Sequence, residues 1–286
     1  YTNQRTLAEL TGYSLGAVNK CLKSLADEGY IDDKMALTDK AKKEFRANTP
    51  QNAIILAAGK GTRMQSRTPK QYLTLENKPV LFYSLETFSK LDIIDEIILV
   101  VSEGEIEYCR EQIIELYGIE KVKAVTEGGA ERYLSVWNGI KHVSTDVEYV
   151  MIHDSARPLI TSDTIKEAHE ILVNKGACVV GVPVKDTIKQ VDEECKVTET
   201  LPRNTLWAAQ TPQCFRKELI TFAYNNMYKA IEEARKCGEE VLITDDAMIV
   251  EAYGDARVCM VQGEYTNIKI TTPEDIELAK LYLKYV

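Results

Sequence analysis

From residue 52 onward, short apolar runs typical of strands alternate with longer stretches that have helical periodicity. Strands are predicted at 53–57, 96–101, 122–125, 149–153, 177–184 and 258–261. Helices are predicted at 80–89, 105–117, 132–142, 162–174, 217–236, 245–252 and 274–285. This alternation predicts an α/β fold, in which a mostly parallel, Rossmann-like sheet is covered by helices on both faces. Ligands of such sheets bind at the carboxyl ends of the strands.

The first 47 residues have a different character. Residues 5–14 are predicted to form a short helix and a turn, and 15–28 an amphipathic helix that stops at Gly29. Residues 31–37 are expected to pair as a small wing. This segment resembles the winged helix-turn-helix modules of bacterial transcription regulators, whose second helix enters the major groove. The resemblance implies DNA contacts by Ser14, Asn19, Lys20 and Lys23.

The charge of this N-terminal segment leaves its role open. Residues 1–50 carry eight Lys or Arg and seven Asp or Glu, so that their net charge is only +1. Such a balance is weak for a surface that binds phosphates. DNA binding and a helical docking module without DNA are equal alternatives. The predicted domains are 1–47, a linker at 48–51, and 52–286.

Composition excludes two further classes of protein. The whole chain of 286 residues has a net charge of −9, which disfavours nucleic-acid coating by the entire molecule. The apolar run at 97–101 is far too short to span a membrane. Seven scattered cysteines without a Cys-x-x-Cys pair predict reduced thiols and a cytoplasmic location.

The segment AIILAAGKGTRMQSRTPKQYL, residues 53–73, joins a predicted buried strand to a glycine-rich loop. Small residues after a strand let the backbone approach a ligand, and freed N–H groups attract anions. Arg63 and Lys70 add positive charge. Met64 stands where a dinucleotide fingerprint needs its third glycine, and Thr62 after Gly61 excludes a P-loop. The segment predicts a nucleotide triphosphate site, with an ordinary basic turn as the alternative.

Other polar residues also follow predicted strands. Asp154 ends one strand and is expected to orient ribose hydroxyls or hold hydrated Mg²⁺, or else to cap a turn. Residues 185–205 leave the sheet and return, which predicts a hairpin arm. Thr244 is a natural N-cap for the helix that follows it. Lys269, taken alone, is expected to be a surface lysine.

Several sequence blocks occur together in the order found in one group of enzymes. They are AAGKGTRM, PKQYL, GGAER, HDSARP, VPVKDTIK, RNTLWAAQTPQ, TDDA and YTNIKITTPED. Over about 52–286 the chain resembles the cytidylyltransferases that activate small sugar-alcohol phosphates with CTP. It is most similar to the 2-C-methyl-D-erythritol 4-phosphate cytidylyltransferases of isoprenoid biosynthesis, with ribitol-5-phosphate cytidylyltransferases close behind. The resemblance implies a nucleotidyltransferase sheet with a protruding β-arm.

The resemblance also implies roles for particular residues. The nucleotide would be bound by Ala57, Ala58, Gly59, Gly61, Gly129, Ser135 and Asp154. The triphosphate would be surrounded by the catalytic side chains of Arg63, Lys70 and Lys269. The acceptor phosphate would be bound by Arg157, Thr187, Arg203, Thr211 and Thr244. Thr187 and Arg203 would reach it from the arm of a partner subunit, in a homodimer. Mg²⁺ or another divalent cation would be held mainly by the CTP phosphates, near Asp154.

The predicted reaction transfers CMP from CTP to the acceptor phosphate and releases pyrophosphate. The acceptor oxygen is already anionic at neutral pH, so the chemistry needs charge stabilisation rather than a general base. Ala130 departs from the Asp that is usual in the erythritol-phosphate enzymes and matches the ribitol-phosphate enzymes, whereas VPVKDTIK and YTNIK favour the former. Methylerythritol 4-phosphate is the predicted acceptor, with ribitol 5-phosphate as the alternative. A DNA-binding regulator that senses a nucleotide is the alternative of another class.

Overall fold

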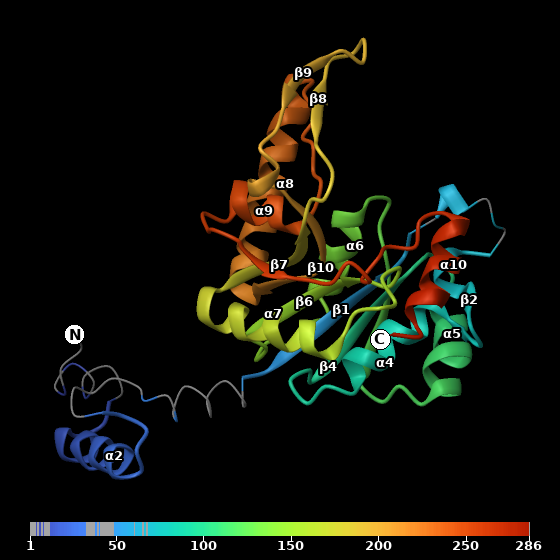
Figure 1. The fold of residues 1–286 in the computed structure, drawn as a ribbon. Helices are drawn as coiled ribbons and strands as arrows, with labels where there is room; N and C mark the ends of the chain where they lie inside the picture. The colour runs from blue at the N-terminus through green and yellow to red at the C-terminus, as the bar shows by residue number, and fades with distance from the viewer. Residues whose placement is uncertain are drawn as a thin grey trace. The chain divides into compact units, whose positions relative to one another are not determined.

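The computed structural model describes residues 4, 6, 8, 12–32, 38, 40, 49–59, 61–64, 66 and 68–285. The chain divides into two compact units, residues 1–49 and 50–286, and each is described by itself. Figure 1 shows the elements of both units along the chain.

The N-terminal unit contains the amphipathic helix that the sequence predicts, α2 (Leu15–Asp27). Ser14 is its N-cap, because its hydroxyl oxygen accepts a hydrogen bond from the backbone N–H of Ala17 at 3.2 Å. Val18 is its buried residue. Half of the residues predicted as a helix and a turn at 5–14, and most of the wing predicted at 31–37, lie outside the described residues.

The second unit is built on a seven-stranded sheet with the order β11-β7-β10-β6-β1-β4-β5. Its strands are β1 (Gln51–Ala57), β4 (Glu96–Val101), β5 (Val122–Glu127), β6 (Tyr149–Asp154), β7 (Ala177–Pro183), β10 (Trp207–Arg216) and β11 (Cys259–Gln262). All pairs are parallel except those of β10, which runs antiparallel to both β6 and β7. The mostly parallel sheet is therefore confirmed.

Two details of the sheet differ from the prediction. Gln51 was expected in the linker, yet it is the first residue of β1 and is fully buried. Strand β10 was not predicted, because its polar sequence WAAQTPQCFR lacks the apolar run that marks the other strands. Residues 210–215 of this strand are nevertheless buried, because the strand lies between β7 and β6.

Helices cover both faces of the sheet, as predicted (Figure 1). They are α4 (Val80–Ser89), α5 (Ile106–Cys109) with a π-helical continuation (Arg110–Glu115), α6 (Arg132–Ile140), α7 (Ser162–Lys175), α8 (Lys217–Cys237), α9 (Asp246–Tyr253) and α10 (Pro273–Tyr282). One apolar core joins α4, α5 and α7 to the sheet, and a second core joins α6, α8 and α9 to it. The N-cap of α9 is Asp245, whose carboxylate accepts from the Met248 N–H at 2.9 Å, so the cap predicted at Thr244 is wrong.

The predicted arm is a hairpin of β8 (Lys189–Val191) and β9 (Val197–Thr200), which pair antiparallel. Every residue of both strands is exposed. Figure 1 shows the hairpin extending away from the sheet. Among the described residues, no helix is long and apolar enough to cross a membrane.

Candidate nucleotide-binding and active site

A pocket of about 330 Å³ opens where β1 and β6 end. Small residues line it from the end of β1 and from the turn before α6, and five charged side chains lie among them. Its lining residues are Leu56, Ala57, Ala58, Gly59, Lys70, Gln71, Gly129, Ala130, Glu131, Arg132, Ser135, Asp154, Ser155, Ala156 and Lys269. It thus contains most of the residues predicted for the nucleotide, together with two of the three predicted catalytic residues. Gly61 and Arg63 are not among its described lining residues, and Arg63 is exposed.

Tight packing explains the glycines at this edge of the sheet. A Cβ atom at Gly128 would lie 2.5 Å from the Cβ of Ala58 and 2.6 Å from the hydroxyl of Ser135. Gly61 has a φ of +58°, and a Cβ there would approach the Lys70 side chain to 3.3 Å. The glycine-rich loop therefore lies against Lys70, which brings its backbone beside a positive charge.

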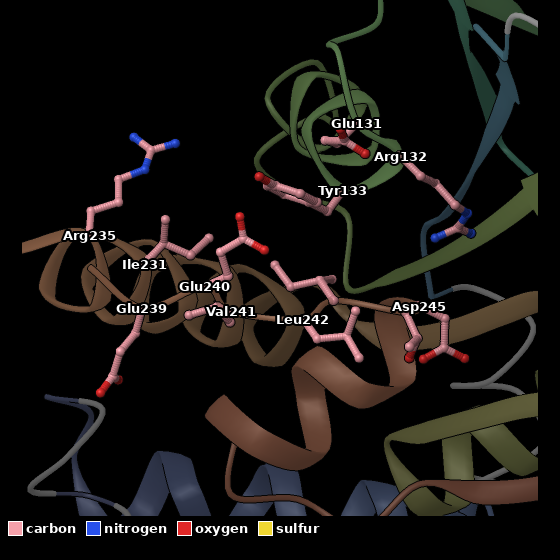
Figure 2. A pocket seen from close by; sticks show the side chains of 12 residues that line it. Glu131, Arg132, Tyr133, Ile231, Arg235, Glu239, Glu240, Val241, Leu242 and Asp245 are labelled. Atoms are coloured by element: carbon pink, nitrogen blue, oxygen red, sulfur yellow. The ribbon is translucent and has the colours of Figure 1, made fainter. Parts of the chain in front are cut away.

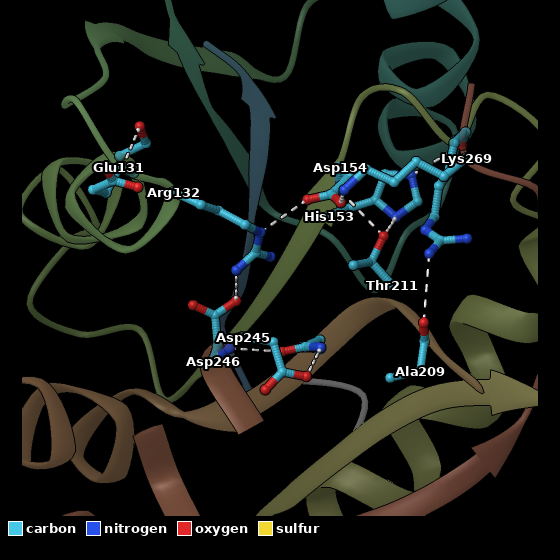
Figure 3. A network of polar contacts seen from close by, with 12 residues as sticks. Glu131, Arg132, His153, Asp154, Ala209, Thr211, Asp245, Asp246 and Lys269 are labelled. Carbon is cyan, nitrogen blue, oxygen red and sulfur yellow. Dashed lines mark hydrogen bonds and ion pairs between the residues drawn. The ribbon is translucent and has the colours of Figure 1, made fainter. Parts of the chain in front are cut away.

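Asp154 is the centre of a charged network (Figure 3). Its Oδ2 lies 2.6 Å from Nζ of Lys269, and its Oδ1 lies 3.3 Å from Nε of Arg132. Burial alone would raise the pKa of the Asp154 carboxyl, but the charges of Arg132 and Lys269 hold it well below its usual value. Lys269, which looked like a surface lysine on its own, is therefore an ion-pair partner within the pocket.

The network continues beyond the pocket. Nη1 of Arg132 lies 2.7 Å from Oδ2 of Asp246, whose carboxylate is fully buried. The hydroxyl of Tyr224 donates a 2.7 Å hydrogen bond to the other oxygen of Asp246. Sequence reasoning missed Arg132 and Asp246, although both lie inside the recognised GGAER and TDDA blocks. Both residues could have been singled out, because they are charged and belong to sequence blocks that the family shares.

Lys70 forms no ion pair with any of the residues that the structure describes. Burial, and next the nearby charge of Lys269, lower its pKa to about 8. Its Nζ donates to the backbone oxygen of Ile270 at 3.3 Å. A partly desolvated lysine beside a second lysine favours the binding of an anion with several charges, such as a polyphosphate.

Two of the predicted acceptor residues adjoin Asp154. The Thr211 hydroxyl accepts from the Asp154 N–H at 3.2 Å and lies 3.0 Å from Nδ1 of His153. Arg157 donates through Nη1 to the backbone oxygen of Asn267 at 2.8 Å. Burial lowers the pKa of His153 to about 4, so this ring is neutral at pH 7, and its Nε2 lies 3.1 Å from the backbone oxygen of Arg157.

The structure of the single chain does not bring the other predicted acceptor residues to this pocket. Thr187 and Arg203 are exposed at the base of the arm, where Nη1 of Arg203 donates to the backbone oxygen of Lys185 at 2.8 Å. Thr244 lines a separate hollow of about 590 Å³ between the start of α6 and the segment after α8 (Figure 2). The two pockets share Glu131 and Arg132.

Comparison with known proteins agrees with this geometry. The family model described as 2-C-methyl-D-erythritol 4-phosphate cytidylyltransferase matches residues 51–285. The chain belongs to this family. A winged helix-turn-helix DNA-binding model matches residues 1–32.

The match to this chain covers nearly the whole length of its relatives and of similar solved structures. The 2-C-methyl-D-erythritol 4-phosphate cytidylyltransferase of Alkaliphilus oremlandii is 48% identical over 233 residues, which cover 82% of this chain and 94% of the relative. The enzyme of Caldanaerobacter subterraneus subsp. tengcongensis is 47% identical, with 82% and 98% covered. The crystal structure of 4-diphosphocytidyl-2C-methyl-D-erythritol synthase from Anaerococcus prevotii superposes with a TM-score of 0.68 and 33% identity, with 82% and 99% covered. The recognised family and the nucleotidyltransferase class are therefore confirmed.

Proposed function

We propose that this protein is an enzyme that transfers CMP from CTP to 2-C-methyl-D-erythritol 4-phosphate and releases pyrophosphate, a step that supplies isoprenoid precursors. Its family membership supports this reaction. The observation that carries the proposal is the grouping of Lys70, Lys269 and Asp154 in one pocket at the carboxyl ends of β1 and β6. That edge is where open α/β sheets bind nucleotides.

The residues of the pocket suit an in-line displacement at the α-phosphorus. An acceptor phosphate oxygen forms the new bond to the α-phosphorus, and the bond to the bridging oxygen of the leaving pyrophosphate breaks. Lys70 and Lys269, with Arg63 from the neighbouring loop, offset the negative charge on the non-bridging and leaving oxygens. Ala57, Ala58 and Gly59 let the nucleotide approach the backbone, while Gly129 and Ser135 line the pocket from the segment that leads into α6.

Mg²⁺ is the proposed cofactor. Among the described residues no group of three or more metal-ligating side chains is present, and Asp154 is already paired with two cations. This donor set fits an ion held mainly by the CTP phosphates, with Asp154 as the carboxylate that faces its water shell. The ion would neutralise phosphate charge when bound.

The acceptor phosphate is proposed to bind near Arg157 and Thr211, with Thr244 farther out. Thr187 and Arg203 would complete this site from a partner subunit, because the exposed arm holds them away from the pocket of its own chain. The guanidinium of Arg203 suits this task, since its planar fork can bind two phosphate oxygens at once. A homodimer with shared sites follows from this proposal.

Ala130 lines the nucleotide pocket and is the residue on which the ribitol 5-phosphate alternative rests. The named relatives all carry the methylerythritol name, which favours that acceptor. Family membership also disfavours a regulator that merely senses a nucleotide.

The N-terminal unit is proposed to be a separate domain that contacts DNA. The match of residues 1–32 to a DNA-binding model supports this role. Ser14 caps α2, whereas Asn19, Lys20 and Lys23 are exposed on it and remain the contact candidates. The cytoplasmic location stays a prediction.

An omission assay tests the proposed reaction. Pyrophosphate release should require CTP, Mg²⁺ and methylerythritol 4-phosphate together. Lys70→Ala should lower turnover by at least about a hundredfold, because it removes a charge that stabilises the transition state. The control Lys166→Ala changes an exposed lysine on α7 and should leave turnover unchanged. Normal turnover in Lys70→Ala would show that the proposed mechanism is wrong.

A further inference from the structure

Among the residues that the structure describes, the buried glutamines have partners at both the oxygen and the nitrogen of their amides, with one exception. Gln213 accepts from the N–H groups of Asp246 and Ala247 and donates to Asp245. Gln210 donates to a backbone oxygen and accepts from Asn267. Gln51, at the opposite end of β1 from the pocket, contacts His169 at 2.7 Å and the sulfur of Met151. Each of these three glutamine side chains therefore has a partner at both its oxygen and its nitrogen.

Gln71 is the exception. Its side chain is only 1% exposed, yet neither Oε1 nor Nε2 has a hydrogen-bond partner in the part of the chain that the structure describes. A buried amide without partners is unfavourable for folding, because it loses its hydrogen bonds to water and gains none. Groups of this kind are rare in folded proteins and require an explanation.

The position of Gln71 supplies that explanation. It follows Lys70 in the short helix η2 (Lys70–Tyr72), and it lines the nucleotide pocket. The glycine-rich loop lies against the Lys70 side chain, so Gln71 belongs to the side of the pocket where the loop and the lysine attract phosphates. Both amide atoms are buried in the free protein, so a rotation of the side chain toward the pocket is what would bring the unused donor and acceptor to a bound polyphosphate.

We propose that Gln71 is a further nucleotide-binding residue, whose Nε2 donates a hydrogen bond to a phosphate oxygen of the bound nucleoside triphosphate. Its Oε1 accepts from a donor that arrives with the ligand, such as a water molecule on the phosphates. The fold leaves the amide without partners until the ligand binds. This lowers the stability of the free protein and raises its affinity for the nucleotide. This inference rests on the proposed function, since it takes the pocket to be the triphosphate site.

The variant Gln71→Met separates a binding role from a structural one. Methionine has nearly the same size and no unsatisfied amide, so the melting temperature without nucleotide should equal or exceed that of the wild type. The KM for CTP should rise at least about tenfold, as expected for losing a hydrogen bond to a charged group, while the KM for the acceptor stays unchanged. The stabilisation by CTP with Mg²⁺, measured without acceptor, should shrink accordingly.

The control Gln51→Met removes a buried amide that is satisfied and lies away from the pocket. It should lower the melting temperature and leave the KM for CTP unchanged. If Gln71→Met behaves like this control, or does not fold, the amide is structural and the inference is wrong. If the wild type lacks turnover but is stabilised by CTP, and Gln71→Met loses that stabilisation, the proposed reaction fails while the inference stands.

Discussion

The lowered pKa of Lys70 predicts how activity depends on pH. Without nucleotide this lysine has a pKa of about 8, because burial and the charge of Lys269 disfavour its protonated form. The value of kcat/KM for CTP reports ionisations of the free enzyme and free substrate. About nine in ten Lys70 side chains are charged at pH 7, and about one in ten at pH 9. We therefore expect kcat/KM for CTP to fall about tenfold between pH 7 and pH 9.

The pH at which the decline begins differs between the two kinetic parameters. A bound triphosphate favours the charged form of Lys70 and raises its pKa, so the decline of kcat should begin at a higher pH than that of kcat/KM. The assay is initial-rate pyrophosphate release at constant ionic strength and saturating acceptor, from pH 6.5 to 10. Both profiles come from the same CTP titrations.

Two variants assign the decline to Lys70. Lys70→Arg keeps its charge at high pH, so the decline in kcat/KM should disappear even if overall activity falls with the changed geometry. Lys217→Arg serves as the control, because Lys217 donates to the backbone oxygen of Ser144 outside the pocket, and it should keep the decline. A flat wild-type profile between pH 7 and 9.5, or a decline that persists in Lys70→Arg, would refute the reasoning.

Three further predictions concern stability, assembly and specificity. Arg132→Met leaves the fully buried carboxylate of Asp246 without its cation, which should lower the free energy of unfolding by about 3 kcal/mol. The melting temperature should then fall by roughly 10 °C, and a change below about 3 °C would contradict this prediction. Arg203→Ala mixed with Lys70→Ala should recover roughly a quarter of wild-type activity through random dimer exchange, since half the dimers then carry one intact site; no recovery despite proven exchange would mean that the arm serves its own chain. Side-by-side rates should favour methylerythritol 4-phosphate over ribitol 5-phosphate in the wild type and in Ala130→Asp; a clear preference of the wild type for ribitol 5-phosphate would show that Ala130 is the better guide to the acceptor.

The sequence predicted the elements whose burial pattern is simple. β1 and β4 are buried on both faces, so their continuous apolar runs predict strands. The small residues that follow β1 indicate a ligand site. β10 escaped prediction because its burial depends on neighbouring strands that only the fold supplies. The N-cap of α9 was placed one residue early, since Thr244 and Asp245 are both good caps and local sequence does not decide between them.

The residues of the site could be predicted where they belong to sequence blocks that resemble the family. Asp154, Lys70 and Lys269 come from three blocks that only the sheet brings together, and the resemblance named all three. The Arg132–Asp246 pair was missed because each residue, taken alone, looks like an ordinary charge at a helix start. The unsatisfied amide of Gln71 was also beyond the sequence, because burial without a partner is a property of packing.

The central claim is attack of an acceptor phosphate oxygen on the α-phosphorus of CTP, and isotope labelling tests it most directly. Methylerythritol 4-phosphate labelled with ¹⁸O in its phosphate would be incubated with the protein, CTP and Mg²⁺, and the products followed by ³¹P NMR. The account predicts a cytidine diphosphate product that keeps all the label, including the bridging oxygen, and unlabelled pyrophosphate. Release of inorganic phosphate, phosphoryl transfer from the γ-position, or loss of label to water would contradict it.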